Sequence, residues 1–324
     1  MDLEGENAVM ENSRSQAYRK ALRDLNVLAP HDVIVVVEGE TGTGKELFVR
    51  ALHERSLRSS GPFYPVNMAE IPVALFESHF YGYRKGAFTG ATENREGLFE
   101  AADKGTLFLD EFNSMSLELQ PKFLRVLETR TYLPVGSLQI RTTGARVVLA
   151  TNVPLKTLWE EGQLREDLYF RLKTHRILLP PLRERLEDLP DLLWGFVRHF
   201  SKLYRKNVPR LEESVMSLLL SYHWPGNVRE LSEKTSSALL HARNDCLTAD
   251  LFFPEDTETT CQEYLAARET WETSYFSQVI RSSGGDHGAG RRITGLSPTT
   301  YRRKIRRYGK NRPLSAGDGD RRSP

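Results

Sequence analysis

A glycine-rich loop lies between an apolar run and a helix-forming segment near the start of the chain. The loop reads GETGTGKE over residues 39–46, after the apolar run 34–37 and before the segment 47–50. Glycines let successive backbone N–H groups turn inward around an anion, and the N-terminus of the following helix adds a partial positive charge. This strand–loop–helix order is the context that a phosphate-binding P-loop requires. The sequence therefore predicts a nucleotide-binding α/β fold.

All eight residues of this loop are predicted to contact ATP. Lys45 would place its positive charge on the β- and γ-phosphates. Glu46 stands where the P-loop pattern has serine or threonine, which leaves the hydroxyl ligand for Mg²⁺ unaccounted for. The predicted ATP-binding residues are Gly39, Glu40, Thr41, Gly42, Thr43, Gly44, Lys45 and Glu46.

A second apolar strand ends in two carboxylates, in the segment GTLFLDE at 105–111. Asp110 is predicted to hold Mg²⁺ directly or through water, and Glu111 to orient and polarise the attacking water. A pair of acidic residues after a strand is by itself typical of an exposed loop. Because a P-loop precedes this pair, the two motifs together predict ATP hydrolysis.

Apolar runs alternate with helical stretches as far as residue 179, which predicts a parallel sheet with crossover helices. The runs are 34–37, 63–66, 107–109, 147–150 and 177–179, after a first helix at 14–29. Residues 186–243 have helical spacing throughout. The predicted organisation is a disordered N-terminus at 1–13, an ATPase domain at 14–243 (α/β part 14–179, helical lid 180–243), a linker at 244–262, a DNA-binding domain at 263–311 and a disordered tail at 312–324.

Composition excludes several classes of protein. Hydrophobic residues make up 39% and charged residues 27% of the 324 positions, as in an ordinary soluble domain. The apolar runs are far shorter than a membrane span, and the acidic start is unlike a signal peptide. Cys246 and Cys261 lack the spacing of a metal site, so we expect free thiols in a reducing cytoplasm.

The hexapeptide GAFTGA at 86–91 has no role in nucleotide chemistry. It carries no charge, no metal ligand and no general base. A turn of Gly, Ala and Thr with one Phe at its tip is suited to moving and to pressing an apolar side chain onto a partner.

P-loop, acidic strand end and GAFTGA together resemble the bacterial sigma-54-dependent transcriptional activators, the enhancer-binding branch of the AAA+ ATPases. The resemblance implies that ATP hydrolysis drives the hexapeptide loop against sigma-54 RNA polymerase and remodels its closed promoter complex. Phe88 and Thr89 would be the main contact residues, supported by a second loop near 133–136. The implied contact set is Gly86, Ala87, Phe88, Thr89, Gly90 and Ala91.

The same resemblance assigns roles to five further residues. Asn67 would pair with Glu111 and switch it in and out of register, and Asn152 would lie near the γ-phosphate as sensor I. Arg165 and Arg171 match the arginines supplied to a neighbouring subunit's nucleotide, which requires a ring; a hexamer is the family expectation. Arg229, in the segment WPGNVREL at 224–231, matches sensor II of the lid.

The C-terminal part predicts binding to double-stranded DNA. Residues 291–312 are rich in Arg and Lys and contain no Asp or Glu, and residues 295–305 resemble a Fis-type helix-turn-helix. Gly290 and Arg291 depart from the family, which has paired alanines there, and each glycine weakens a helix by roughly 1 kcal/mol. The predicted DNA contacts are Ser297, Thr299, Thr300, Arg302 and Arg303.

About 30 residues precede the ATPase motifs, which leaves no room there for a phosphoreceiver domain. Control by a separate binding protein, by expression level or by partner subunits would then replace phosphorylation. Phage-shock and type III secretion regulators (the hrp type) share this short layout, and the analogy makes virulence control a hypothesis.

Two other functions remain open at this stage. The chain could be a DNA-binding regulator that senses nucleotide and acts on the ordinary polymerase, although loss of GAFTGA or Glu111 would then be expected. An AAA+ unfoldase or helicase would normally carry a pore aromatic–hydrophobic pair or strand-tracking motifs, and the sequence has neither.

Overall fold

The computed structural model describes residues 13–242 and 246–253, and positions 276, 279–280, 283, 286–294, 301–302 and 304–305. Two compact units divide the chain, Met1–Phe252 and Phe253–Pro324. Within the described residues, no helix combines the length and apolar character needed to cross a membrane.

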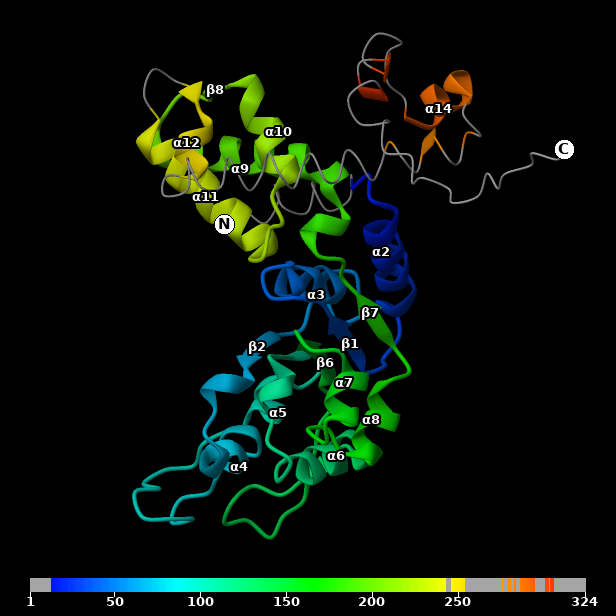
Figure 1. Cartoon of the computed structure of the whole chain (residues 1–324). Helices are drawn as coiled ribbons and strands as arrows, with labels where there is room; N and C mark the ends of the chain where they lie inside the picture. Colours follow the sequence, from blue (N-terminus) through cyan, green and yellow to red (C-terminus); the bar gives the residue numbers. More distant parts are fainter. Residues whose placement is uncertain are drawn as a thin grey trace, which may run out of the picture. The chain divides into compact units, whose positions relative to one another are not determined.

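A five-stranded parallel sheet forms the centre of the first unit (Figure 1). Its strands are β1 (Val35–Glu38), β2 (Phe63–Asn67), β3 (Thr106–Asp110), β6 (Arg146–Thr151) and β7 (Arg176–Leu178), in the order β2-β3-β6-β1-β7. Every neighbouring pair is parallel. The predicted α/β fold and all five predicted strands are confirmed, with no bound shifted by more than one residue.

Helices cover both faces of the sheet. Val35 and Val37 face one apolar cluster with α2 (Gln16–Leu28) and α3 (Lys45–Glu54), while Val36 belongs to the cluster on the other face. Successive strand residues point to opposite faces, so a strand buried on both sides is apolar throughout. The second face is covered mainly by α4 (Phe76–Phe80), α5 (Leu98–Ala101), α6 (Gln120–Thr129), α7 (Leu155–Glu160) and α8 (Glu166–Leu172).

Short 3₁₀ helices and small strands join these elements. The 3₁₀ helices of the α/β part are η1 (Met68–Glu70), η2 (Val73–Leu75) and η3 (Phe112–Ser114). Two short antiparallel strands, β4 (Thr131–Tyr132) and β5 (Arg141–Thr142), form the base of a loop at 133–140.

A helical lid follows the sheet in the sequence, and its helices are drawn above α3 in Figure 1. It comprises η4 (Leu182–Glu184), η5 (Leu186–Asp188), α9 (Leu189–Tyr204), α10 (Glu213–Ser221), α11 (Asn227–His241) and α12 (Ala249–Phe252), with the parallel strands β8 (Arg210–Leu211) and β9 (Cys246–Leu247).

The predicted linker at 244–262 needs correction, because its residues 246–252 are folded within the first unit. Leu247 and Phe252 are almost fully buried, and Leu247 pairs with Leu211. This burial of apolar side chains joins the segment to the lid, so a linker can begin only after Phe252.

The second unit contains α14 (His287–Thr294), a helix that spans Gly288, Gly290 and Arg291. A small cluster of buried side chains, Phe276, Val279 and Tyr301, lies in the same unit. The Tyr301 ring meets the His287 ring edge-on at 6.1 Å. These contacts give the segment an apolar centre of its own. Most of the predicted helix-turn-helix lies outside the described residues.

Candidate nucleotide site and exposed loops

The glycine-rich loop connects the carboxyl end of β1 to the N-terminus of α3, as predicted. Gly42 and Gly44 have φ angles of +77° and +96°, the left-handed region that glycine tolerates. Among the residues that the structure describes, no acceptor takes the backbone N–H groups of Gly42, Gly44 or Lys45. Free N–H groups at a helix N-terminus form a site that suits phosphate oxygens.

Lys45 lies in this loop with its ammonium group turned onto the backbone. Its Nζ donates to the carbonyl oxygens of Gly39 at 2.8 Å and Glu40 at 3.1 Å. Burial lowers the pKa of Lys45, the carboxylates of Asp110 and Glu111 oppose that shift, and Arg229 adds to it. Asp110, Glu111 and Arg229 therefore act electrostatically on Lys45.

Asp110 and Glu111 lie at the carboxyl end of β3, on the same edge of the sheet as the loop. Asp110 accepts a hydrogen bond from the Glu111 N–H at 2.9 Å. Glu111 has φ +51°, a left-handed conformation that costs a residue with a side chain on the order of 1 kcal/mol. Such strain is common where a side chain must be aimed for function.

The carboxylate at this site suits a magnesium ion that is also held by the phosphates of a nucleotide. No group of three His, Cys, Asp or Glu side chains gathers in the described part of the chain. Glu46 pairs instead with Arg50 at 3.4 Å. Mg²⁺ usually binds through one or two carboxylates together with phosphates and water, and Asp110 supplies one such carboxylate.

The two predicted asparagines have different surroundings. The Asn152 amide donates to the Thr41 hydroxyl at 3.4 Å, and its Oδ1 is buried without a partner, which leaves an acceptor beside the loop. Asn67 hydrogen-bonds to the Ala69 N–H and to Glu70 rather than to Glu111. The predicted Asn67–Glu111 pair is therefore not formed here, because Asn67 caps the 3₁₀ helix that follows β2.

The lid contacts the loop at more points than the sequence predicted. The backbone of Arg229 donates to Gly42 at 3.2 Å, which brings the predicted sensor arginine to the site. Three further lid residues make side-chain contacts with the loop that sequence reasoning missed: Arg183, Arg185 and Asn227. Asn227 stands two residues before Arg229 in the same motif, and that proximity was the available signal.

Arg183 and Glu40 form a two-pronged ion pair between lid and loop. Both terminal nitrogens of Arg183 donate to the Glu40 carboxylate, at 2.5 and 2.8 Å. These hydrogen bonds are the main reason that the pKa of Glu40 falls to about 2. Glu40 therefore stays ionised and bound to the lid at neutral pH.

Arg165 and Arg171 lie on or beside α8, away from this chain's own loop. Arg165 is exposed and pairs with Asp167 at 2.8 Å, and Arg171 is exposed in the last turn of α8. Their side chains are accessible to a neighbouring molecule.

The GAFTGA segment forms a tight exposed turn. The Gly86 N–H donates to Ala91 at 2.9 Å, and the Ala91 N–H donates to Phe88 at 3.0 Å. Phe88 is 47% exposed and meets the Tyr83 ring at 4.9 Å, whereas Ala91 is buried. Phe88, Thr89 and Gly90 therefore form the accessible tip, and the buried Ala91 closes the turn.

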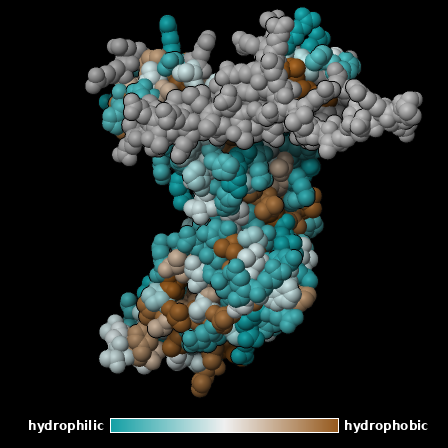
Figure 2. All heavy atoms as spheres, viewed as in Figure 1, coloured by the Kyte–Doolittle hydropathy of each residue, from teal (hydrophilic) through white to brown (hydrophobic). Residues whose placement is uncertain are grey.

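The loop at 133–140 lies directly against this turn. Arg84 donates to Val135 at 3.0 Å, and a side chain at Gly136 would approach the Ala87 Cβ to 2.7 Å. Leu138 is fully exposed and Ile140 is 67% exposed. Figure 2 shows hydrophobic atoms at the lower end of the unit, where both loops project in Figure 1.

Of the residues predicted to contact DNA, Arg302 lies in the part of the chain that the structure describes, and it is exposed. Ser297, Thr299, Thr300 and Arg303 lie outside the described residues.

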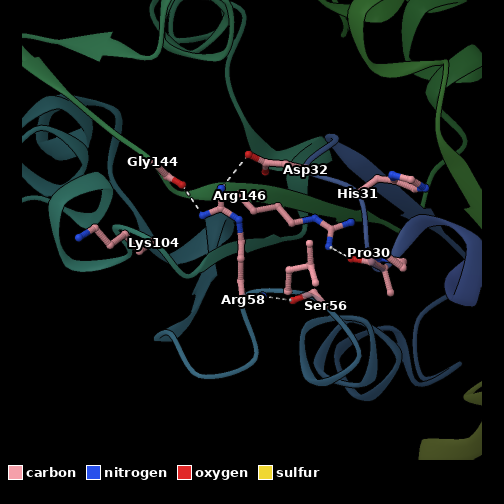
Figure 3. A pocket seen from close by; sticks show the side chains of 10 residues that line it. Pro30, His31, Asp32, Ser56, Arg58, Lys104, Gly144 and Arg146 are labelled. Atoms are coloured by element: carbon pink, nitrogen blue, oxygen red, sulfur yellow. Dashed lines mark hydrogen bonds and ion pairs between the residues drawn. The ribbon is translucent and has the colours of Figure 1, made fainter.

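A cavity of ≈ 410 Å³ lies at the opposite edge of the sheet from the P-loop (Figure 3). The buried Arg146 beside it donates to the backbone carbonyls of Leu28 and Ala29 at the end of α2, both at 2.8 Å. Arg58 donates to Asp32 and to the Gly144 carbonyl. Both arginines are occupied by protein acceptors, and the cavity is lined by the segments that follow α2 and α3 and by those that precede β3 and β6.

A parallel sheet with a P-loop, an acidic strand end and a helical lid defines the chain as a P-loop ATPase of the AAA+ class. Residues 12–178 match the model of the sigma-54 interaction domain, and residues 183–267 match that of the AAA+ ATPase lid domain. The chain belongs to the sigma-54 interaction domain family of transcriptional activators.

Similar proteins include several bacterial regulators. The formate hydrogenlyase transcriptional activator of Salmonella typhimurium is 39% identical over 305 residues, which are 91% of this chain and 44% of that protein. The DNA-binding transcriptional regulator NtrC of Bradyrhizobium sp. is 44% identical over 241 residues, covering 74% of this chain and 49% of that protein. The chain thus spans about half the length of these relatives.

A solved structure of NtrX from Brucella abortus in complex with ATP has the same fold. It is 29% identical, with a TM-score of 0.69, and the match covers 92% of this chain and 68% of that one. The ADP complex of the same protein matches equally well.

Proposed function

We propose that this chain hydrolyses ATP in a ring of subunits and uses the GAFTGA turn to remodel sigma-54 RNA polymerase. The observation that carries the proposal is the combination of a P-loop ATPase with an exposed turn of uncharged residues, with Phe88 at its tip, in one compact unit. That turn has no part in nucleotide chemistry, so a partner that receives work from the ATPase explains it best.

Within the site, each residue would have a distinct part. The loop N–H groups and Lys45 would bind the phosphates, and Asp110 would hold Mg²⁺, which supplies charge neutralisation on the phosphates when bound. Glu111 would orient and deprotonate the attacking water. Asn152 and Arg229 would report the state of the nucleotide, and Asn67 would bind Glu111 in another state of the cycle.

The exposed positions of Arg165 and Arg171 support the proposal of a ring. A trans arginine stabilises charge on the transferred phosphoryl group and can contribute on the order of 10³–10⁵ in rate. These two residues are exposed on α8 and would complete the site of the next subunit. A hexamer stays the family expectation for the number of subunits.

DNA binding by the second unit would bring the ring to its promoter. The basic segment 291–312 and the exposed Arg302 support this part of the proposal.

The proposal is tested by binding of purified sigma-54 to the full chain with a non-hydrolysable ATP analogue. We expect binding with the analogue, weak binding with ADP, and loss of binding in Phe88→Ala. Equal binding in all three cases would contradict the role of the turn. Binding to the ordinary polymerase instead would favour the nucleotide-sensing regulator.

A further inference from the structure

The lid holds the outer side of the P-loop through three consecutive backbone carbonyls. Asn227 Nδ2 donates to the carbonyl oxygen of Thr41 at 2.9 Å. The N–H groups of Val228 and Arg229, at the start of α11, donate to the Gly42 carbonyl at 2.9 and 3.2 Å. The Thr43 carbonyl accepts from Arg185 at 3.0 Å. Every carbonyl from 41 to 43 is therefore bound by the lid.

Binding of these carbonyls fixes the direction of the loop N–H groups. The C=O of one residue and the N–H of the next belong to one planar trans peptide and point in opposite directions. When Thr41 and Thr43 turn their carbonyls to the lid, the N–H groups of Gly42 and Gly44 point away from it. These are two of the N–H groups without an acceptor among the described residues.

Burial and hydrogen bonds fix the side chain of Asn227 in this contact. It is fully buried, has φ +54°, and uses its Oδ1 to accept from the Leu182 N–H at 2.8 Å. Its amide also donates to Glu40 at 3.2 Å. Because both the oxygen and the nitrogen of the Asn227 amide are hydrogen-bonded, the side chain has one orientation. The loop carbonyl that it binds is therefore held in place.

Arg185 is equally constrained. Its side chain is 4% exposed, and its guanidinium lies 4.4 Å from the centre of the Tyr18 ring. A planar guanidinium stacked on an aromatic ring keeps its direction, unlike a flexible surface arginine.

We propose that Asn227 and Arg185 are positioning residues that shape the phosphate cradle from the lid side. They touch no reacting atom themselves. They turn the N–H groups of Gly42 and Gly44 toward the nucleotide before it binds, which lowers the ordering cost of binding. The inference rests on the proposed function in one respect, that the P-loop binds ATP.

The test is the Kd of the full chain for a fluorescent ADP derivative, measured by titration. Asn227→Asp keeps the shape, the backbone conformation and the acceptor for Leu182, but removes the donor to Thr41 and Glu40 and places a second carboxylate beside Glu40. Arg185→Met keeps the packing on Tyr18 and removes the donor to Thr43. We expect the Kd to rise roughly 3- to 30-fold in each variant, and Arg185→Lys, which retains a donor, to recover most of the affinity.

Arg146→Met is the matched control. Arg146 is also a buried arginine that donates to backbone carbonyls, but it does so at the opposite edge of the sheet (Figure 3). We expect it to lower the midpoint of thermal unfolding and to leave the Kd within about twofold of the parent's.

Three results would overturn the inference. If Asn227→Asp and Arg185→Met both bind the nucleotide as the parent does, the lid does not shape the cradle. If Arg146→Met weakens binding as much as Arg185→Met, the effect is general destabilisation. No binding by the parent chain would overturn the proposed function as well, which separates the two failures.

Discussion

Glu111 and Lys45 adopt conformations or surroundings that lower the stability of the fold. Glu111 adopts a left-handed backbone conformation, and burial lowers the pKa of Lys45. Both features cost free energy of folding. A fold keeps such costs at positions where they serve binding or catalysis.

Replacing Glu111 by Gln should abolish hydrolysis and spare binding. Gln has the same shape but cannot accept a proton from water, so we expect the ATPase rate to fall about 10²–10⁴-fold. The Kd for a fluorescent ADP derivative should stay within about threefold of the parent's. A variant with near-parental turnover would show that Glu111 is not the base.

Acid should weaken the link between lid and loop within a defined pH window. The pKa of Glu40 is lowered from 4.5 to about 2 by Arg183. Because the folded pKa lies below the unfolded one, the contribution of Glu40 to stability is complete above pH 4.5 and is lost as pH falls toward 2. In urea unfolding, the parent should lose more stability than Glu40→Gln between pH 5 and pH 3. Parallel losses would contradict the assignment.

At the scale of elements, the turn at 86–91 and the loop at 133–140 pack against each other. Backbone hydrogen bonds join Val135 to Gly82 and Arg84, which lie just before the turn at 86–91, and Gly136 lies against Ala87 within the turn. A shift of one loop must move the other. The second loop can therefore set the position of Phe88.

Gly136→Ala tests this contact, since the added Cβ would come within 2.7 Å of the Ala87 Cβ. We expect ATP-dependent promoter opening to fall at least tenfold, while the ATPase rate stays within about twofold. Gly162→Ala is the control, because Gly162 has a similar φ of +71° but no atom within 4 Å of an added Cβ. Equal effects of the two substitutions would mean that backbone strain, not the loop contact, is responsible.

The elements of the site could be predicted from sequence, whereas most contacts between them could not. Apolar runs and glycines identified β1, β3 and the P-loop, since these signals are local. Arg183 and Asn227 reach Glu40 from 143 and 187 residues further along the chain. Such pairs depend on how the lid packs, which no local pattern encodes. The hydrogen bond that Asn67 makes here, to the start of the 3₁₀ helix after β2, is a local cap that the resemblance did not indicate.

At the scale of the whole molecule, the site is proposed to need a second subunit. The exposed Arg165 and Arg171 lie away from their own P-loop, so an isolated chain would lack an arginine for the transferred phosphoryl group. ATPase activity should then rise steeply with protein concentration.

Mixing two inactive variants tests this arrangement directly. The double variant Arg165→Ala with Arg171→Ala keeps Glu111 but supplies neither arginine, and Glu111→Gln supplies both arginines but has no base. Each alone should lose on the order of 10³ in ATPase rate, and an equimolar mixture should regain a measurable part of it. A mixture as inactive as its components would contradict hydrolysis at a shared site.

Formation of open complexes by sigma-54 RNA polymerase on a supercoiled promoter, with ATP, tests the central claim most directly. The parent chain should open the promoter, and Thr89→Ala should fail to do so while its ATPase rate is retained, because Thr89 lies at the exposed tip of the turn. Opening by Thr89→Ala at the parental level, or no opening by a parent chain that hydrolyses ATP, would contradict the coupling of hydrolysis to the polymerase through this turn.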